Sequence, residues 1–354
     1  MMKKRHTVFV GMSGGVDSSV AAALLKERGF DVVGIHLRCY NVDGCAEQDA
    51  EDARRAAETL GIPFYVLDYE KEYKAKVVEY MIDGYRQGIT PNPDVMCNKE
   101  IKFGLFLEAA LKMGADYVAT GHYVRIKHGR RNSALFAARD SNKDQSYFLW
   151  TLTQRQLRHC LFPIGDYLKP EVRKLASKYD LPNAEKKDSQ GICFLGQVTL
   201  GDFLGEYLPK KKGIIVTTEG KIVGEHDGAH HFTIGQRHGL NVSGPKPHYV
   251  VEKDVAANAV LVAEGDNHPA LFKRKIALHN VNLIHHSAKL LDGARVQARV
   301  RYRQPVSEAV CRVEKETVTL TFKSPQKFVA EGQSAVLYSN SGEMLGGGVI
   351  VSAG

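Results

Sequence analysis

The sequence predicts an α/β N-terminal domain built on a parallel sheet, followed by a small central β-rich domain and a C-terminal β-barrel. In the first part of the chain, short apolar segments alternate with amphipathic helical segments, which is typical of parallel strands joined by right-handed crossovers. After Tyr207 the pattern changes to short strands separated by Gly, Asn and Asp. A last all-β block runs from residue 275 to residue 354, and short strands with such turn signals favour a small barrel.

The elements of the first domain are expected in alternating order. We expect strands at residues 7–10, 31–37, 64–67 and 116–120, and helices at 20–25, 47–60, 71–85 and 101–113. The helical pattern continues over residues 144–179. Ligands of parallel sheets bind beyond the carboxyl ends of the strands. Ser13, Gly121 and His122 all follow expected strands, so we expect them to share one crevice.

The second half of the chain is expected to be mainly β. We expect strands at residues 213–223, 231–234, 248–253 and 259–263, and the alternation of apolar and polar residues is clear over 295–302 and 317–322. A chain of 354 residues exceeds one ordinary core. We therefore expect three domains, with boundaries at 1–207, 208–274 and 275–354.

Composition and the pattern of apolar residues argue against a membrane protein and against a secreted, disulfide-rich protein. No apolar run approaches the ~18 residues of a membrane span, and Gly11 and Ser13 interrupt the first apolar stretch too early for a signal peptide. A cytoplasmic protein is therefore expected. The six cysteines are too few for a disulfide scaffold. A net charge of +8 favours a polyanionic partner.

A glycine- and serine-rich turn, GMSGGVDSS, follows the first expected strand. The adjacent Gly14 and Gly15 let backbone N–H groups converge on an anion, serine hydroxyls add donors, and the following helix adds its positive end. The turn predicts a phosphate-binding loop. It differs from a Walker loop because the G-x-x-x-x-G-K-[ST] order and its lysine are absent. The alternative is an ordinary tight turn between a strand and a helix.

Two cysteines are candidates for chemistry. Asp94 and Cys97 follow a rigid Pro- and Asn-rich loop and can face one another at the start of a helix, where the dipole favours a thiolate. A nearby carboxylate opposes the thiolate unless it accepts a proton. The alternative is a helix cap beside a small buried cysteine. Cys193 is expected near the end of a strand, where a cysteine is more often a core residue than a reactive one, and the two cysteines could meet only through the fold.

A series of blocks in this chain resembles the bacterial tRNA-specific 2-thiouridylases of the PP-loop ATP pyrophosphatase superfamily. The blocks are GMSGGVDSS, TPNPDVMCNKEIKF, ATGHYVR, KDQSYFL, SQGICF, FTIGQRHGL and RYRQ, and they span essentially the whole chain. Members of this family use ATP, which they split into AMP and pyrophosphate, to replace the 2-oxygen of the wobble uridine of tRNA with sulfur. The resemblance implies an N-terminal domain of the adenine nucleotide alpha hydrolase type, with a central domain and a β-barrel.

The resemblance also implies a role for each matched residue. The ATP site would comprise Gly11, Met12, Ser13, Gly14, Gly15, Val16, Asp17, Ser18, Leu37 and Gly121. The target base would contact Asn92, Pro93 and Asp94, with Asp94 as the acid/base group. Cys193 would carry a persulfide, and Cys97 would release the product by forming a transient disulfide with Cys193. The tRNA contacts would be His122, Lys143, Asp144, Gln145, Arg301, Tyr302 and Gln333.

Cofactors and partners follow from the same resemblance. They are ATP, with inferred Mg²⁺, a tRNA, and a cysteine desulfurase or sulfur-relay protein as sulfur donor; a monomer is expected. An iron–sulfur cluster held by Asp94, Cys97 and Cys193 stays open, because related thiolating enzymes use one. Two other classes remain as alternatives. Another PP-loop adenylating synthetase or amidotransferase would need no distant cysteine pair, and a non-catalytic tRNA-binding protein would form no AMP.

Overall fold

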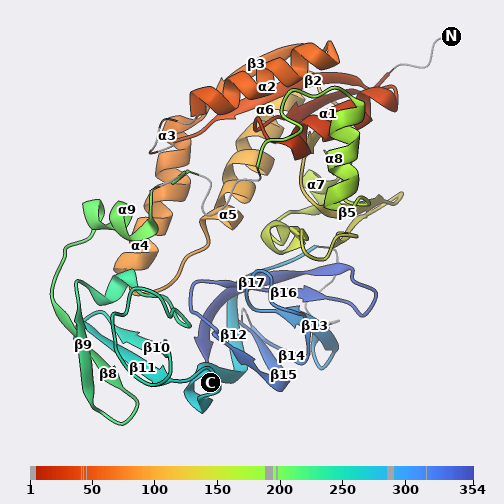
Figure 1. Ribbon diagram of the computed structural model, residues 1–354. Coiled ribbons are helices and arrows are strands. Elements are labelled where there is room, and N and C mark those ends of the chain that lie inside the picture. Colours follow the sequence, from red (N-terminus) through yellow and green to blue (C-terminus); the bar gives the residue numbers. More distant parts are fainter. Residues whose placement is uncertain are drawn as a thin grey trace. The chain divides into compact units, whose positions relative to one another are not determined.

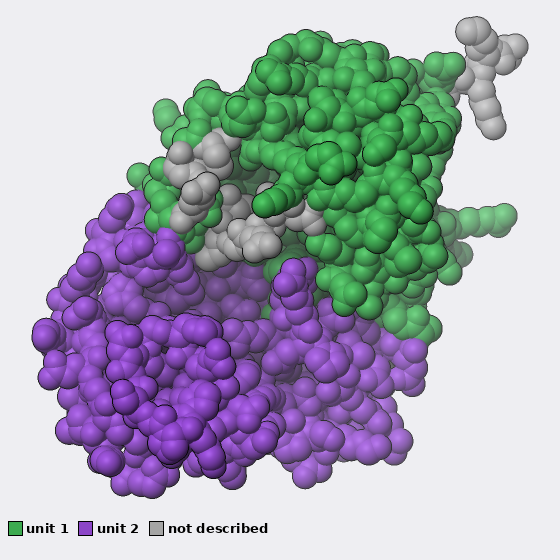
Figure 2. Space-filling view, viewed as in Figure 1, with its two compact units in different colours: residues 1–77, 94–198, 341–345 green, residues 78–93, 199–340, 346–354 purple. Residues whose placement is uncertain are grey.

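The protein is described here by a computed structural model that covers residues 5–40, 42, 44, 46–187, 194–196, 198–284, 291–315 and 317–354 (Figure 1). The chain divides into two compact units, coloured separately in Figure 2. Unit 1 comprises residues 1–77, 94–198 and 341–345, and unit 2 comprises residues 78–93, 199–340 and 346–354. Within the described part of the chain, no helix is long and apolar enough to cross a membrane.

Unit 1 is organised around a five-stranded parallel sheet with the order β3-β2-β1-β4-β7, as the sequence predicted. Its strands are β1 (Thr7–Gly11), β2 (Asp31–Arg38), β3 (Phe64–Asp68), β4 (Tyr117–Thr120) and β7 (Cys160–Leu161). The strand order reverses between β1 and β4, which is where doubly wound sheets bind their ligands. Gly11 pairs with Thr120 at the ends of these two strands, so the segments that follow them leave the sheet side by side.

The helices of unit 1 cover this sheet with small side chains. The helix α1 (Val16–Glu27) contacts both α2 (Ala46–Leu60) and α8 (Lys169–Lys178), and α2 lies against β2 and β3 (Figure 1). Alanines on these helices allow the backbones to approach closely. The resulting core includes Val8, Val10, Val20, Ala21, Ala22, Leu25, Ala53, Ala56, Ala57, Val172 and Ala176.

Helix boundaries in unit 1 differ from the expected ones at three places. The expected helix 71–85 is divided into α3 (Glu70–Tyr73), a π-helical turn (Lys74–Val78) and α4 (Glu79–Arg86), and α4 belongs to unit 2. The expected helix 101–113 begins earlier, as α5 (Pro93–Met96), the π-helical η2 (Cys97–Leu105) and α6 (Phe106–Lys112). The expectation of a continuous helical pattern over 144–179 is wrong, because only η3 (Ser146–Leu149), α7 (Gln154–Leu157) and α8 are helical there.

Two β features of unit 1 were not predicted. The hairpin of β5 (Val124–His128) and β6 (Ser133–Ala137) follows β4 directly. The sheet also contains β7, a strand of only 2 residues, within the region predicted to be helical. A strand this short cannot show an alternation of apolar and polar residues, so the sequence does not predict it. Its strand conformation depends on pairing with β4.

Unit 2 contains a small sheet and a closed barrel, which confirms the expected β-rich architecture. The sheet has the order β10-β11-β8-β9, with β8 (Gly213–Thr217), β9 (Ile222–His226), β10 (His248–Asp254) and β11 (Ala259–Glu264). The barrel strands are β12 (Phe272–Leu283), β13 (Arg295–Arg299), β14 (Ser307–Glu314), β15 (Thr317–Lys327), β16 (Ser334–Tyr338) and β17 (Met344–Ala353). The short helix α9 (Leu200–Tyr207) precedes the sheet.

Three expected strands of unit 2 are wrong in detail. The strand expected at 213–223 is divided by a turn into β8 and β9, which pair with each other. The strand expected at 295–302 ends at Arg299, so Arg301 and Tyr302 lie in the turn that follows, where Arg303 adopts a φ of +65°. The strand expected at 231–234 is absent, and a 3₁₀ turn at Ala229–His231 takes its place. In these last two places polar turn geometry overrides a short run of strand-forming residues.

Candidate functional site

The loop after β1 has a backbone that only glycine can adopt. Gly14 has a φ of +74°, and a Cβ at that position would lie 2.4 Å from the carbonyl oxygen of Asp49 in α2. The helix α1 begins after Gly15 without a side-chain cap. The first N–H groups of a helix have no partner within the helix. They and the positive end of the helix dipole therefore form a suitable binding place for a phosphate.

Serine side chains form hydrogen bonds within this loop. The hydroxyl of Ser18 donates to the carbonyl of Gly15 at 3.1 Å and accepts from the backbone N–H of Ser13 at 3.2 Å. The hydroxyls of Ser13 and Ser18 are 3.3 Å apart. The proton of the Ser18 hydroxyl is therefore used within the loop, and the Ser13 hydroxyl is the one that could add a donor beside the start of α1.

Asp17, in the first turn of α1, is paired with two residues from distant parts of the chain. The ammonium of Lys169 lies 2.8 Å and 2.9 Å from the two carboxylate oxygens, and the hydroxyl of Tyr123 donates to one of them at 2.9 Å. The Lys169 side chain is only 12% exposed. Sequence reasoning assigned neither Lys169 nor Tyr123 to the site. Tyr123 lies in the ATGHYVR block, whereas Lys169 gives no local signal.

The end of β4 packs tightly on the start of α1. A Cβ at Gly121 would lie 2.6 Å from the backbone nitrogen of Ser18. The next residue, His122, is buried against the rings of Phe103 and Phe162, and its Nδ1 lies 2.7 Å from the hydroxyl of Thr120. Burial holds the pKa of His122 well below its usual value, so the imidazole is neutral at physiological pH.

The polar residues predicted to bind tRNA in unit 1 also shape their own loop. The side-chain oxygen of Gln145 accepts from the backbone N–H of Tyr123 at 2.9 Å, and the backbone N–H of Gln145 donates to the Tyr123 carbonyl at the same distance. The buried carboxylate of Asp144 accepts from the N–H groups of Ala138 and Ser146, both at 3.1 Å. Lys143 is half-buried in the same loop. Contact of these residues with tRNA stays a prediction.

Asp94 and Cys97 lie at the start of the helical region formed by α5, η2 and α6. Asp94 is in α5 and Cys97 is the first residue of η2, where Cys97 is only 4% exposed. Burial raises the pKa of Asp94, and the charge of Lys102 opposes this effect only in part. A carboxyl group with a raised pKa is suited to proton transfer. The π-helical geometry of η2 is common at functional sites.

Cys193 lies outside the described residues, together with residues 188–192. Phe194, which follows it in the chain, is buried, and its ring centroid lies 5.8 Å from that of Tyr73 and 6.2 Å from that of Tyr40. The Phe194 carbonyl accepts from the backbone N–H of Val42 at 3.1 Å. The described residues therefore include Cys97 of the predicted cysteine pair, and the pairing itself stays a prediction.

The remaining predicted residues fall in unit 2 or at the sheet. The amide of Gln333 donates to the carbonyls of Thr90 and Pro91 at 3.0 Å and 3.3 Å, which holds the loop that leads to Asn92 and Pro93. Leu37 pairs with Leu67 near the carboxyl end of β2.

In the turn after β13, Arg301 donates to the carbonyl of Ile234 at 3.2 Å, and the ring of Tyr302 lies 5.4 Å from the guanidinium of Arg303. Among the described residues, no group of three or more His, Cys, Asp and Glu side chains could hold a metal ion.

Comparison with known proteins places this chain in a family. Residues 6–197 match the family model described as the tRNA methyl transferase HUP domain, residues 201–264 the tRNA methyl transferase PRC-barrel domain, and residues 273–350 the aminomethyltransferase beta-barrel domain. A protein of Akkermansia muciniphila named tRNA-specific 2-thiouridylase MnmA is 48% identical over 356 residues, which cover 98% of each chain. The chain belongs to the tRNA-specific 2-thiouridylase family.

Other members of the 2-thiouridylase family match over a similar length. A protein of Geobacillus kaustophilus named tRNA-specific 2-thiouridylase MnmA 1 is 47% identical over 348 residues, covering 96% of this chain and 94% of the relative. Solved structures resemble this family member only remotely. The structure titled NMN synthetase from Francisella tularensis is 18% identical with a TM-score of 0.35, and it aligns with 57% of this chain and 72% of its own. Values this low support no functional inference.

Proposed function

We propose that this protein replaces the 2-oxygen of the wobble uridine of tRNA with sulfur in an ATP-dependent reaction. Membership of the 2-thiouridylase family supports the overall activity. The observation that carries the proposal is the uncapped glycine- and serine-rich loop after β1, at the point where the strand order of the sheet reverses. A loop of this construction is suited to the phosphates of ATP.

The first step that we propose is adenylation of the base. The 2-oxygen of the uracil attacks the α-phosphorus of ATP, the new O–P bond forms, and pyrophosphate leaves with the electrons of the broken bond. Backbone N–H groups of Gly15 and of the first turn of α1, with the hydroxyl of Ser13, would stabilise the charge on the phosphates, while Ser18 holds the loop in shape. Mg²⁺ bound to ATP would neutralise part of this charge, whereas the carboxylate of Asp17 is already paired with Lys169 and Tyr123.

The second step that we propose is delivery of sulfur. A persulfide on Cys193 attacks C2 of the adenylated base through its outer sulfur, and AMP leaves. The Cys97 thiolate then attacks the inner sulfur, so the S–S bond breaks, the 2-thiouridine leaves and a Cys97–Cys193 disulfide forms. Asp94 would accept the thiol proton. An external thiol reduces the disulfide and a sulfur donor, such as a cysteine desulfurase or a relay protein, reloads Cys193.

The test is an incubation of protein, ATP, Mg²⁺, a sulfur donor, a reductant and unmodified tRNA, followed by measurement of AMP and thiolated nucleoside. We expect both products from the unaltered protein, and no thiolated nucleoside from Cys193→Ser. Cys97→Ser should stop turnover after sulfur has joined the base. Cys311→Ala, which removes a buried thiol of β14, serves as the matched control and should retain activity. Thiolation by Cys193→Ser at the unaltered rate would overturn the persulfide step.

Iron analysis separates the persulfide route from the cluster route. A cluster held by Asp94, Cys97 and Cys193 predicts stoichiometric iron and visible absorption in anaerobically purified protein. The persulfide route predicts full activity from iron-free protein. AMP formation that depends on ammonia instead of sulfur would favour a synthetase, and tRNA binding without AMP formation would favour a non-catalytic tRNA-binding protein.

A further inference from the structure

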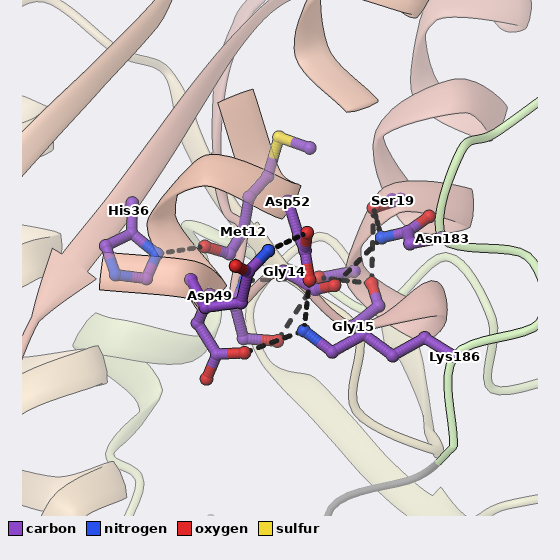
Figure 3. A network of polar contacts seen from close by, with 12 residues as sticks. Met12, Gly14, Gly15, Ser19, His36, Asp49, Asp52, Asn183 and Lys186 are labelled. Carbon is purple, nitrogen blue, oxygen red and sulfur yellow. Dashed lines mark hydrogen bonds and ion pairs between the residues drawn. The ribbon is translucent and has the colours of Figure 1, made fainter. Parts of the chain in front are cut away.

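A turn from a distant part of unit 1 inserts a side chain into the phosphate loop (Figure 3). The amide nitrogen of Asn183 donates to the carbonyl of Gly14 at 2.9 Å and to the hydroxyl of Ser19 at 3.0 Å. Asn183 and Gly14 are 169 positions apart in the chain. Asn183 is 5% exposed, so its amide is a buried and directed donor to the loop backbone.

The same turn is fastened to the helix α2 by an ion triad. The backbone N–H of Lys186 donates to the carbonyl of Asn183 at 3.0 Å. The ammonium of Lys186 lies 2.7 Å from an oxygen of Asp49 and 2.6 Å from an oxygen of Asp52 (Figure 3). The backbone of Asp49 also packs against Gly14. The loop, the turn that carries Asn183 and Lys186, and the helix α2 therefore each contact the other two.

The contact between Lys186 and Asp52 favours the charged form of both groups. Burial lowers the pKa of Lys186, but its hydrogen bonds and charge interactions with Asp49 and Asp52 outweigh burial, so the pKa is raised overall. Burial likewise raises the pKa of Asp52, and the hydrogen bond from Lys186 reverses the effect, so that pKa is lowered. The half-buried ion pair of Lys186 and Asp52 has a defined geometry because either charge would be costly to bury without the other.

The hydrogen bond from Asn183 fixes the direction in which the N–H of Gly15 points. The carbonyl of Gly14 and the N–H of Gly15 belong to one planar trans peptide, so they point in opposite directions. Fixing the carbonyl toward Asn183 therefore turns the Gly15 N–H to the opposite side. Two adjacent glycines give this peptide more freedom than other residues would, so an external contact is needed to hold it in one orientation.

We infer that Asn183 and Lys186 are positioning residues that orient the Gly14–Gly15 peptide for the phosphates of ATP. Asn183 holds the peptide, and Lys186 holds Asn183 by anchoring the turn to α2. His36 supports the other side of the loop, where its Nδ1 lies 3.0 Å from the carbonyl of Met12. The inference rests on the proposed function, because it takes this loop to be the ATP site.

The test compares two neighbouring lysines by titrating ATP into the protein in a calorimeter and by measuring the KM values for ATP and for tRNA. Lys186→Gln should weaken ATP binding and raise the ATP KM about tenfold, while the KM for tRNA stays unchanged. Lys187→Gln removes the same charge from an exposed position one residue along and should bind ATP normally. Lys186→Arg keeps the charge and should restore ATP affinity to within about threefold of the unaltered protein.

Asn183→Asp is the second variant, and it places an acceptor opposite the Gly14 carbonyl. It should weaken ATP binding at least as much as Lys186→Gln does. Circular dichroism and thermal melting check that each variant is folded; if Lys186→Gln is unfolded, Asp52→Asn takes its place and should weaken ATP binding about tenfold. Equal ATP affinity in the Lys186 (or Asp52) and Lys187 variants overturns the inference. Failure of the unaltered protein to bind ATP would instead overturn the proposed function.

Discussion

Asp17 is a charged residue whose partners, Lys169 and Tyr123, lie outside its own helix. Its place in the first turn of α1 is favourable for a carboxylate, since the helix dipole is positive there. Lys169 balances the charge and Tyr123 supplies a further donor, so the partly buried carboxylate is not left alone. The phosphate loop therefore presents its backbone donors beside a carboxylate that is already neutralised.

Removal of one hydroxyl tests this arrangement. Tyr123→Phe deletes the donor to Asp17 and leaves Lys169 in place. A hydrogen bond to a charged group is worth ~1.5–3 kcal/mol, and Lys169 should compensate in part, so we expect the ATP KM to rise about three- to tenfold. AMP release at saturating tRNA measures it. Tyr65→Phe, at an exposed position of β3, is the control. An unchanged ATP KM in Tyr123→Phe would show that Asp17 does not need the hydroxyl.

At the scale of elements, the close approach of β4 to α1 builds the site. β1 and β4 are neighbours in register, so the loop after β1 and Gly121 emerge together at the edge of the sheet. The backbone of Gly121 then lies directly against the start of α1, where a side chain would overlap Ser18. The tight packing holds the N-terminus of α1 in its place beside the sheet.

A methyl group at this contact should disturb it. Gly121→Ala must push β4 and α1 apart, and overpacking of this kind costs ~1–3 kcal/mol in the free energy of unfolding. We expect ATP affinity to fall about tenfold or more, as measured by calorimetry. Gly201→Ala is the matched control, because a Cβ there meets only the Thr199 hydroxyl oxygen, at 3.9 Å. Normal ATP binding by Gly121→Ala would contradict the positional role of this contact.

At the scale of the whole molecule, the residues predicted to contact tRNA are shared between the two units. Lys143 and Gln145 belong to unit 1, whereas Arg301, Tyr302 and Gln333 belong to unit 2. The loop proposed to bind ATP, residues 11–18, lies entirely in unit 1. A substitution in unit 2 can therefore change tRNA binding without changing the nucleotide site.

Arg301→Ala tests this separation. We expect tRNA binding to weaken about five- to tenfold and the dependence of log affinity on log salt to fall by about 1, as for the loss of a phosphate contact. ATP affinity should not change. Filter binding over a series of salt concentrations measures both quantities, and Arg312→Ala, at an exposed position of β14, controls for charge alone. An unaltered salt slope would remove Arg301 from the interface.

The sequence alone determined the parts of this protein whose signals are local. The parallel sheet and the tight turn between its first strand and helix were predictable because apolar periodicity and paired glycines act over a few neighbouring residues; phosphate binding by this turn stays a prediction. The barrel was predictable from alternation, although its strand at Arg295–Arg299 ends before Arg301. The role of Cys193 stays a prediction.

Only the tertiary structure decided which distant side chains complete the loop. Lys169, Asn183 and Lys186 reach residues of the phosphate loop and of α2 that lie more than a hundred positions earlier. No local pattern marks them, because a lysine or asparagine in a polar turn has the same sequence neighbourhood whether it is solvated or paired. Burial forces the pairing: once the fold removes these groups from water, each charge and donor must find a partner.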